Sequence, residues 1–468
     1  MTNKLERMCF ASYLLLLVWL PIPLGSNRIW AWTIAEIWIG LSACMLVISL
    51  MRHGSRLALD SIKQFGWLLF PIALFQLWIL CQIIPMPLSW LEWVSPAASI
   101  AYQRTGADVG YISLDPRTTY IALLKGVFYF IFVLCSAILI NNGERIRTVM
   151  LAIVVGGTLQ AFYAVLNVLL GVEQSILFGL QEEGIATGTF VYKNHLANYL
   201  LLCLCIGIGL IVTDMQSGRA SYNSWQDRIQ QWLRLVSSQR MLVRLALVII
   251  VIALVMTRSR MGNGAFLAAT LVVGFVALIF YRNRPSNLTW FLVSILVVDI
   301  VIMGSLFGLD KLQQRVADSY IDQDSRHLVI TWSIPMIKDY LLTGIGLGSF
   351  YVVFPSYTQH AIGYYDHAHN EYIQFVTEAG LPATIMLGST LLWAFGLSIW
   401  VMINRNSQTC KGAAFGCLMA LCAMLMHIWV DFNLQSPANT VTFLTVLVLI
   451  GASYSVVSPR RYKDVKHV

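Results

Sequence analysis

Long apolar stretches alternate with short polar segments along almost the whole chain of 468 residues. A transmembrane helix needs about 20 apolar residues in succession, and many of these stretches reach or approach that length. We count twelve, at residues 9–25, 30–50, 66–84, 119–140, 148–171, 194–213, 243–257, 262–281, 289–308, 379–403, 412–430 and 438–457. The pattern therefore predicts an all-α polytopic membrane protein with about twelve transmembrane helices.

The polar segments divide this array unevenly. Most of them are short, but residues 309–378 form a long polar segment between the ninth and tenth predicted helices. We therefore expect three parts in the chain. Residues 1–308 carry transmembrane helices 1–9, residues 309–378 form a large external loop, and residues 379–468 carry transmembrane helices 10–12 and a polar tail.

The composition favours a membrane protein over a soluble one. Hydrophobic residues make up 58% of the chain and charged residues only 12%, whereas a soluble globular chain has about 25% charged residues. This shortage of charge argues against a soluble enzyme, a disordered protein and a nucleic-acid-binding protein. The net charge of +8 matters mainly through the places where the basic residues lie.

The distribution of Lys and Arg predicts the orientation, because cytoplasmic loops of membrane proteins are enriched in both. If the N-terminus is cytoplasmic, 20 of the 31 basic residues fall on the cytoplasmic side, and both termini lie there. On that side, Trp and Arg alternate within residues 214–242 in a pattern that predicts an amphipathic helix at the inner leaflet. The long loop 309–378 is then on the outer side, together with the remaining basic residues.

Two histidines stand out near the end of the long outer loop. His367 and His369 belong to the run DHAHNEYIQF, in which a helix is expected to begin at Asn370. Imidazole can accept a proton from a hydroxyl group near neutral pH, so this pair is a candidate general base. Two surface histidines in a connecting segment are the alternative interpretation.

Two arginines lie between the seventh and eighth predicted helices. Arg258 and Arg260, in the run TRSRMG, fall at the outer surface, where basic residues are otherwise disfavoured. The planar guanidinium group forms paired hydrogen bonds with phosphate, so this run is a candidate phosphate-binding site. In the alternative interpretation, one arginine reaches water and the other pairs with an acidic residue.

Further basic residues lie at the same surface. Arg326 begins an amphipathic segment after Asp324, and Lys193 and His195 begin the sixth predicted helix. Arg326 is poorly placed for the helix dipole, which suggests another role. Lys193 is equally explained by a side chain that reaches from the helix end to water. Asp322 and Asp324 have a metal-binding spacing, but a single such triplet in a chain of this length is close to chance.

Charged residues also lie inside the predicted spans. Glu36, Lys125 and Asp299 are three of them, and intramembrane charges usually face the interior of a helix bundle. Lys125 could pair with either acid. His427 and Asp431, near the end of the eleventh span, form a polar cluster for which we expect a structural hydrogen-bonding role.

The cysteines indicate neither a disulfide framework nor a metal site. Their number is nine, and nearly all of them fall in apolar stretches, where a thiol acts as a small buried hydrophobe. No spacing of Cys and His resembles a zinc site. We therefore expect no bound metal.

Six runs of residues together resemble one family. They are TGTFVYKNHLANY, TRSRMG, DSRHLVITW, LTGIGLGSF, HAHNEYIQFVTEAGL and WVDFNLQSPAN, in this order from about residue 185 to residue 440. In their order, their spacing and the long penultimate outer loop, they resemble the O-antigen ligase and O-antigen polymerase superfamily of bacterial inner-membrane glycan transferases. The resemblance implies a GT-C-like glycosyltransferase architecture in the inner membrane, with the outer loop in the periplasm.

The resemblance also implies an activity and a set of site residues. Such proteins transfer a glycan from an undecaprenyl-diphosphate carrier to an acceptor hydroxyl at the periplasmic face, with no cofactor. By position, His369 matches the family's essential histidine, and Arg260 and Arg326 match its arginines, so these three are the expected catalytic residues. The expected substrate-binding residues are Arg258, Lys193, His367 and His195. Pro382 replaces the family's usual glycine after the run GL.

The sequence leaves the identity of the acceptor open. Ligases of the superfamily use the lipid A-core, polymerases use another carrier-linked glycan, and related members glycosylate protein. The expected partners are the undecaprenyl-diphosphate-linked donor, one of these acceptors and the lipid bilayer, with no nucleic acid. A transporter or flippase for lipid-linked oligosaccharides is the alternative from another class, because twelve spans with a cationic outer surface fit it too. A structural subunit of a secretion machine would leave the His and Arg residues unused.

Overall fold

The computed structural model describes residues 4–54, 56–181, 184–215, 239–285, 287–306 and 326–456. Within these ranges the chain is mostly helical, and its named strands are β1 (Met86–Pro87) and β2 (Val109–Gly110), which pair antiparallel. The expected all-α class is confirmed. Most of residues 214–242 and the triplet from Asp322 to Asp324 lie outside the described residues.

Each of the twelve predicted spans falls on one helix of the described chain. These helices are α1 (Lys4–Trp19), α2 (Ile29–His53), α4 (Gly66–Gln82), α7 (Pro116–Leu139), α8 (Gly143–Leu170), α9 (Lys193–Asp214), α11 (Gln239–Met256), α12 (Arg260–Phe280), α13 (Leu288–Leu306), α17 (Leu381–Asn404), α18 (Gln408–His427) and α19 (Pro437–Ser455). The end expected for the first span, residue 25, is wrong, because α1 stops at Trp19, before Pro21 and Pro23. A proline has no backbone N–H, and its ring obstructs the preceding helical turn.

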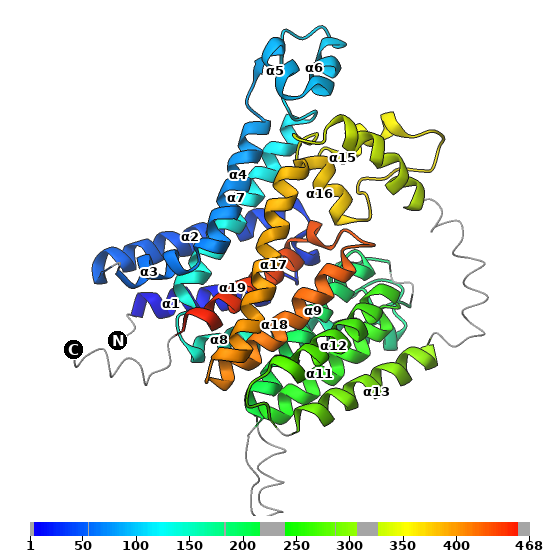
Figure 1. Ribbon diagram of the computed structural model, residues 1–468. Coiled ribbons are helices and arrows are strands. Elements are labelled where there is room, and N and C mark those ends of the chain that lie inside the picture. Colours follow the sequence, from blue (N-terminus) through cyan, green and yellow to red (C-terminus); the bar gives the residue numbers. More distant parts are fainter. Residues whose placement is uncertain are drawn as a thin grey trace, which may run out of the picture.

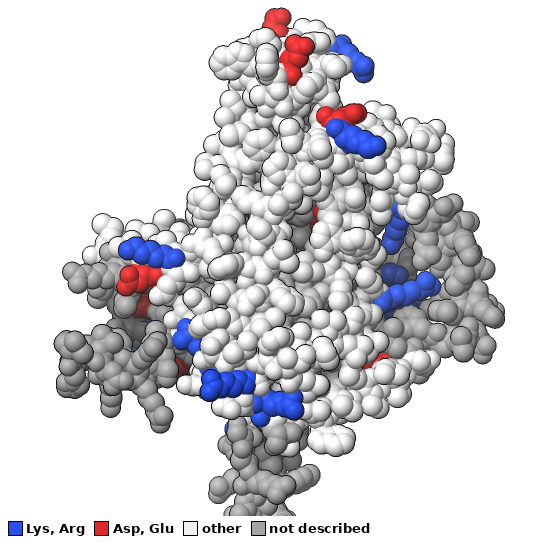
Figure 2. Space-filling view, in the orientation of Figure 1, with Lys and Arg blue, Asp and Glu red and all other residues white. Residues whose placement is uncertain are grey.

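These helices differ in whether they could cross a membrane on their own. Among the described residues, eight are long and apolar enough, and a ninth is added if α3 (Arg56–Gln64) and α4 form one span with a 78° bend. A multi-pass membrane protein is therefore supported, and the number of twelve crossings stays a prediction. On the face drawn in Figure 2, charged side chains gather toward the ends and edges and leave a broad uncharged area, as a lipid-facing surface requires.

Helices α9 and α18 form the buried centre of the bundle (Figure 1). Their backbones approach closely at glycines: a methyl group added to Gly209 would lie 2.7 Å from the carbonyl oxygen of Gly412 and 2.8 Å from the Cα of Gly416. Small residues permit such close helix contacts within membranes. The two helices run antiparallel, so the N-terminal end of α9 lies beside the C-terminal end of α18, where Asn198 contacts His427.

Short elements form a cap over one end of the bundle. They are α5 (Leu88–Val94), α6 (Pro96–Gln103), a helical stretch at residues 326–339, α15 (Phe350–Val353), η2 (Phe354–Tyr357) and α16 (Glu371–Ala379). A separate apolar core joins them, with Leu91, Ile112, Trp332 and Phe350 among its members. Figure 1 shows α5, α6, α15 and α16 together at this end. The described part of the long loop 309–378 is therefore folded into the cap.

Candidate active site

The ring of Phe432 lies at the centre of the candidate site. The imidazole rings of His195, His367 and His369 lie 5.0, 4.7 and 4.7 Å from it, measured between ring centroids. Tyr192 stacks against the same ring at 5.5 Å. The structure therefore brings together the three histidines that the sequence predicted, although a long stretch of chain separates His195 from the other two.

A different element positions each of these rings. His195 lies in the first turn of α9 and is 5% exposed. His369 directly precedes Asn370, whose side chain accepts a hydrogen bond from the N–H of Ile373 (3.2 Å) and so caps α16. Phe432 lies in residues 428–436, which connect α18 to α19. The site is thus the meeting point of two helix N-termini and one connecting segment.

Two of the expected site residues have a left-handed backbone conformation. In the described part of the chain, five residues other than glycine have positive φ, and they include Arg258 (φ 52°) and His369 (φ 49°). This conformation costs roughly 1 kcal/mol or more for an L-amino acid and persists only where surrounding contacts enforce it. Such strain often occurs at functional sites, so this observation supports a role for both residues.

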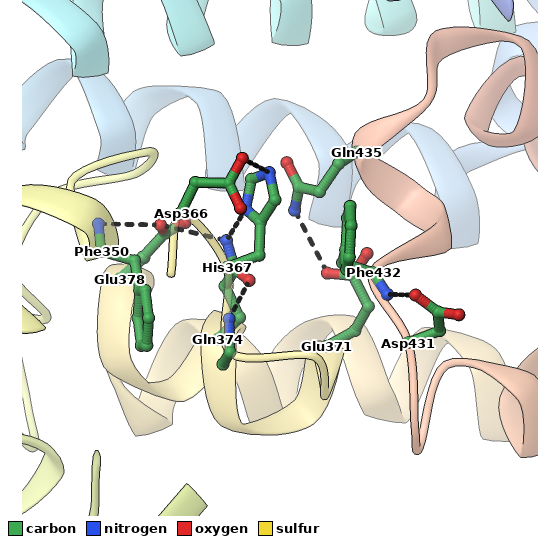
Figure 3. Close-up of polar contacts among 10 residues, drawn as sticks. Phe350, Asp366, His367, Glu371, Gln374, Glu378, Asp431, Phe432 and Gln435 are labelled. Atoms are coloured by element: carbon green, nitrogen blue, oxygen red, sulfur yellow. Dashed lines mark hydrogen bonds and ion pairs between the residues drawn. The ribbon is translucent and has the colours of Figure 1, made fainter. Parts of the chain in front are cut away.

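His367 is held as a neutral imidazole by its surroundings. The side-chain oxygen of Gln374 accepts a hydrogen bond from the N–H of Ala368 (3.1 Å). The amide nitrogen of Gln374 therefore faces His367 and donates to Nδ1 of that ring (3.0 Å; Figure 3). The ring proton then lies on Nε2, which faces Asp366 at 3.8 Å. Burial lowers the pKa of His367 below its usual value, although Asp366 acts in the opposite direction. A neutral imidazole at this position can take part in proton transfer.

Glu378 connects this arrangement to the glycine-rich run. One carboxylate oxygen of Glu378 accepts hydrogen bonds from Gln374 (3.3 Å) and from the N–H of Phe350 (3.2 Å), as Figure 3 shows. Burial raises the pKa of Glu378 to about 7. A methyl group added to Gly344 (φ 68°) would lie 2.2 Å from the carbonyl oxygen of Glu378. Glycine is therefore required at this position by close backbone packing and needs no nucleotide to explain it.

Glu371 fixes the segment that carries Phe432. Its carboxyl group accepts hydrogen bonds from the side chain of Gln435 (3.2 Å; Figure 3) and from the N–H of Leu434 (2.8 Å). Its own N–H donates to the carbonyl of Ile428 (3.0 Å). The side chain is fully buried, and burial raises the pKa of Glu371 to about 8. Three hydrogen bonds thus hold this segment to α16.

Basic residues lie next to this aromatic centre. Asp431, which is 1% exposed, precedes Phe432 and has Arg326 and Lys193 as charged neighbours. Burial raises the pKa of Asp431 to about 6, against the opposing effect of these two cations. Arg326 also neighbours the hydroxyl of Tyr192, whose pKa is raised by burial to about 12. The structure therefore brings Arg326 and Lys193 to the edge of the aromatic centre.

Arg258 and Arg260 lie at a neighbouring helix end. Ser259 caps α12 by accepting a hydrogen bond from the N–H of Gly262 (3.2 Å). A methyl group added to Gly262 would lie 3.0 Å from the Cβ of Ala197, one turn along α9 from Lys193. Both arginines are exposed. In Figure 2, Lys and Arg side chains gather on the right-hand side below the cap.

Of the two acids that the sequence offered to Lys125, Glu36 is the one that acts on it electrostatically. The ammonium group of Lys125 lies 5.1 Å from the ring centroid of Trp32, and Glu36 is its nearby opposite charge. Asp299 instead lines an apolar groove between α9, α11, α12 and α13. Lys125 also acts electrostatically on His367, so this pair lies on the histidine side of the site.

His427 has the structural role expected for it. It is fully buried, and its Nδ1 lies 3.2 Å from the side-chain nitrogen of Asn198. Asn439 donates a hydrogen bond to the carbonyl of His195 (3.1 Å). These contacts form a polar layer directly beneath the histidines.

A comparison with known protein families found a match for the region that holds most of these residues. Residues 245–388 match the family model described as O-antigen ligase. This match supports the resemblance to the O-antigen ligase and polymerase superfamily that the six sequence runs indicated. Together with the apolar helices, the match supports a membrane glycan transferase of the O-antigen ligase and polymerase type. A comparison with curated proteins found no match.

The O-antigen ligase match contains the arginines and the histidine pair but omits part of the site. Arg258, Arg260, Arg326, His367 and His369 all lie within residues 245–388. Lys193 and His195 precede the matched region, and Phe432 follows it. In the described residues, no group of three or more His, Cys, Asp or Glu side chains is arranged to hold a metal ion.

Several contributing residues were not found from the sequence. Tyr192 and Phe432 lie within the quoted runs TGTFVYKNHLANY and WVDFNLQSPAN, but aromatic residues are common at membrane surfaces and gave no distinct signal. Gln374 and Glu378 are four residues apart, and this spacing on one helix face was the available hint. Their contacts with His367 and Phe350 depend on tertiary folding.

Proposed function

We propose that this chain transfers a saccharide from undecaprenyl diphosphate to an acceptor hydroxyl at the periplasmic face of the bacterial inner membrane. The observation that carries the proposal is the meeting of His367 and His369 with Arg326 and Lys193 around Phe432 and Asp431. A base and a group of cations side by side suit a reaction in which a hydroxyl loses its proton while a diphosphate departs.

Arg260 and Arg326 bind the diphosphate in this proposal, with Arg258 and Lys193 as further contacts. Guanidinium groups form paired hydrogen bonds with phosphate oxygens. They also stabilise the negative charge that develops as the bond between sugar C1 and the phosphate oxygen breaks, an effect worth about 3 kcal/mol per contact. The bonding electrons leave with the diphosphate, and no metal ion is needed to hold them.

His369 accepts the proton of the acceptor hydroxyl. The acceptor oxygen then forms the new bond to C1 on the side opposite the departing diphosphate, so the anomeric configuration inverts. A positioned base contributes roughly 10²–10⁴-fold to such a step. His367 and His195, whose rings contact Phe432 as that of His369 does, are substrate-binding residues in this proposal.

The membrane arrangement follows from the same proposal. Both termini are cytoplasmic, residues 1–308 and 379–468 cross the membrane in a GT-C-like architecture, and residues 309–378 form the periplasmic part. The distribution of basic residues supports this orientation. It brings the cap to the side on which a lipid-linked glycan is exposed.

One experiment tests the activity and identifies the acceptor. The purified protein in nanodiscs is given an undecaprenyl-diphosphate-linked repeat unit, with and without lipid A-core. Glycan growth on the carrier alone indicates a polymerase, and transfer only with lipid A-core indicates a ligase. Transfer to an added acceptor protein indicates a protein O-oligosaccharyltransferase.

The His369→Ala variant is the test of the base. We expect it to insert, purify normally and lose transfer. His360→Asn is the matched control, because His360 is an exposed histidine of the same connecting segment. An active His369→Ala protein removes this assignment. Carrier-linked glycan that crosses proteoliposomes with no new glycosidic bond, in wild type and variant alike, indicates the transporter or flippase instead.

A further inference from the structure

The hairpin of α5 and α6 carries an exposed aromatic face that the proposed reaction does not use. Trp90 is 69% exposed and Trp93 is 91% exposed, and their spacing of three residues puts both indoles on one face of α5. Val94 and Ile100 extend the apolar surface, with 45% and 50% exposure. Large apolar side chains gathered on a surface usually mark an interaction site.

The opposite side of the hairpin is well packed. Leu91 and Ala98 are fully buried in the core of the cap. An added methyl group at Gly110 would lie 2.7 Å from a methyl group of Leu91, and the hydroxyl of Tyr102 donates a hydrogen bond to the carbonyl of Ser113 (2.7 Å). The hairpin therefore has a defined inner side, and the two indoles project from a folded unit.

The aromatic face continues a stripe that faces lipid on the preceding helix. On α4, the side chains of Phe70, Leu74 and Leu77 are 69%, 42% and 57% exposed, at spacings that place them on one helix face. Ile84, 46% exposed, continues this row toward α5. Figure 1 shows α5 and α6 beyond the end of α4. In a membrane protein an exposed apolar stripe of this kind is in contact with lipid.

We propose that the Trp90–Trp93 face of α5 lies in the interface of the outer leaflet and anchors the cap to the membrane. Indole is enriched at this depth, because its ring is apolar and its N–H can still reach water or lipid headgroups. The neighbours Ile84, Val94 and Ile100 are apolar, whereas a sugar-binding face needs side chains that hydrogen-bond sugar hydroxyls. A lipid surface is therefore the partner that fits.

This anchor has a consequence for the active site, which rests on the proposed function. The core that contains Leu91 also contains Val329 and Trp332 of the stretch that follows Arg326, and Ala368 between the two histidines. A hairpin fixed in the outer leaflet therefore sets the height of Arg326 and His369 above the lipid. A lipid-linked diphosphate lies at that height, in the headgroup layer.

Nitroxide accessibility in nanodiscs tests the anchor without any substrate. Cys44 and Cys81 are the exposed cysteines and are replaced by Ser, which leaves the seven buried ones unlabelled. A spin label is then placed at residue 90 or residue 93 by Trp90→Cys or Trp93→Cys. Collision rates are measured with oxygen, which concentrates in lipid, and with a nickel chelate, which stays in water.

We expect oxygen to collide more often than the nickel chelate at residues 90 and 93. A label at the exposed neighbour Glu92, introduced by Glu92→Cys, should show the reverse order, because residue 92 lies on another face of α5. Higher nickel than oxygen collision rates at both Trp positions overturn the proposal. Low rates for both reagents overturn it too and indicate a protein partner. Neither result bears on glycan transfer, so the two proposals fail separately.

Discussion

Buried carboxyl groups organise the candidate site at the scale of single residues. Glu371 holds the segment with Phe432 through Leu434 and Gln435, and Glu378 holds Gln374, which orients His367. Burial raises the pKa of Glu371 to about 8 and that of Glu378 to about 7. In the folded protein both groups therefore retain protons that the unfolded chain releases near the ordinary glutamate pKa of 4.5.

These raised pKa values predict a loss of stability in mild base. Since the folded state binds more protons than the unfolded state between these values, the free energy of unfolding falls as the pH rises through this range. We expect the melting temperature of the wild type to drop between about pH 6 and about pH 8.5. Glu371→Gln should remove part of this drop, because the amide keeps an acceptor oxygen for the N–H of Leu434 and does not titrate.

Differential scanning fluorimetry at the two pH values measures the effect. Glu92→Gln, which alters an exposed carboxyl group on α5, is the control and should behave as the wild type. An equal drop in the wild type and in Glu371→Gln would contradict the assignment of a buried, protonated Glu371.

The geometry of the guanidinium group predicts a second effect at this scale. Arg326→Ala should lower the rate of glycan transfer about 10²-fold or more, because it removes a donor to the departing diphosphate. Arg326→Lys should recover only part of the rate, since an ammonium group cannot form the paired hydrogen bonds of a planar fork. The initial rate with the carrier-linked donor is the measurement. Arg104→Ala, an exposed change at the C-terminal end of α6, should retain full activity. Full activity of Arg326→Lys would contradict this role of the paired hydrogen bonds and show that a positive charge at residue 326 is sufficient for transfer.

At the scale of elements, the glycine-rich run and α16 are held together by backbone contacts. The N–H of Ile345 donates to the carbonyl of Thr377 (2.9 Å), and the N–H of Gly346 donates to that of Glu378 (3.1 Å). This close approach depends on Gly344, where an added methyl group would lie 2.2 Å from the carbonyl oxygen of Glu378. The glycine-rich run is thus fixed to α16. This contact positions α15, which follows the run, relative to the histidine pair, which precedes α16.

Gly344→Ala tests this packing. The new Cβ would lie 2.2 Å from the carbonyl oxygen of Glu378, at a φ of 68°. We expect a loss of several kcal/mol in the stability of the cap, seen as a lower melting temperature and lost transfer. Gly388→Ala in α17 is the matched control, because no atom lies within 4 Å of its new Cβ. A Gly344→Ala protein as stable as the control would refute the close contact.

At the scale of the whole molecule, the orientation in the membrane decides whether the cap can meet a lipid-linked glycan. The uncharged area in Figure 2 separates the cap from basic side chains at the opposite end of the bundle. Arg282 and Arg284 lie between α12 and α13, and Arg405 lies between α17 and α18. In the proposed orientation, the positive-inside tendency puts these two segments in the cytoplasm. The same orientation predicts that the cap lies in the periplasm.

Cysteine labelling checks this orientation. In a background with Cys44 and Cys81 replaced by Ser, Ala361→Cys in the cap should react with a membrane-impermeant maleimide on intact spheroplasts. Asn406→Cys, between α17 and α18, should react only after the membrane is permeabilised. Both positions are exposed, so burial does not limit the reaction. The reversed pattern would overturn the orientation and, with it, a periplasmic site.

The sequence alone determined the helical membrane class, the approximate position of the twelve apolar helices and the residue types able to do the chemistry. Hydropathy and charge are local properties, so a stretch of about 20 residues reports them directly. The tertiary structure alone decided that His195 joins His367 and His369 at Phe432 and that Glu36, and not Asp299, lies near Lys125. These contacts depend on the antiparallel packing of α9 and α18 and on backbone hydrogen bonds of α16. Such contacts join segments far apart in the chain, and no local pattern encodes them.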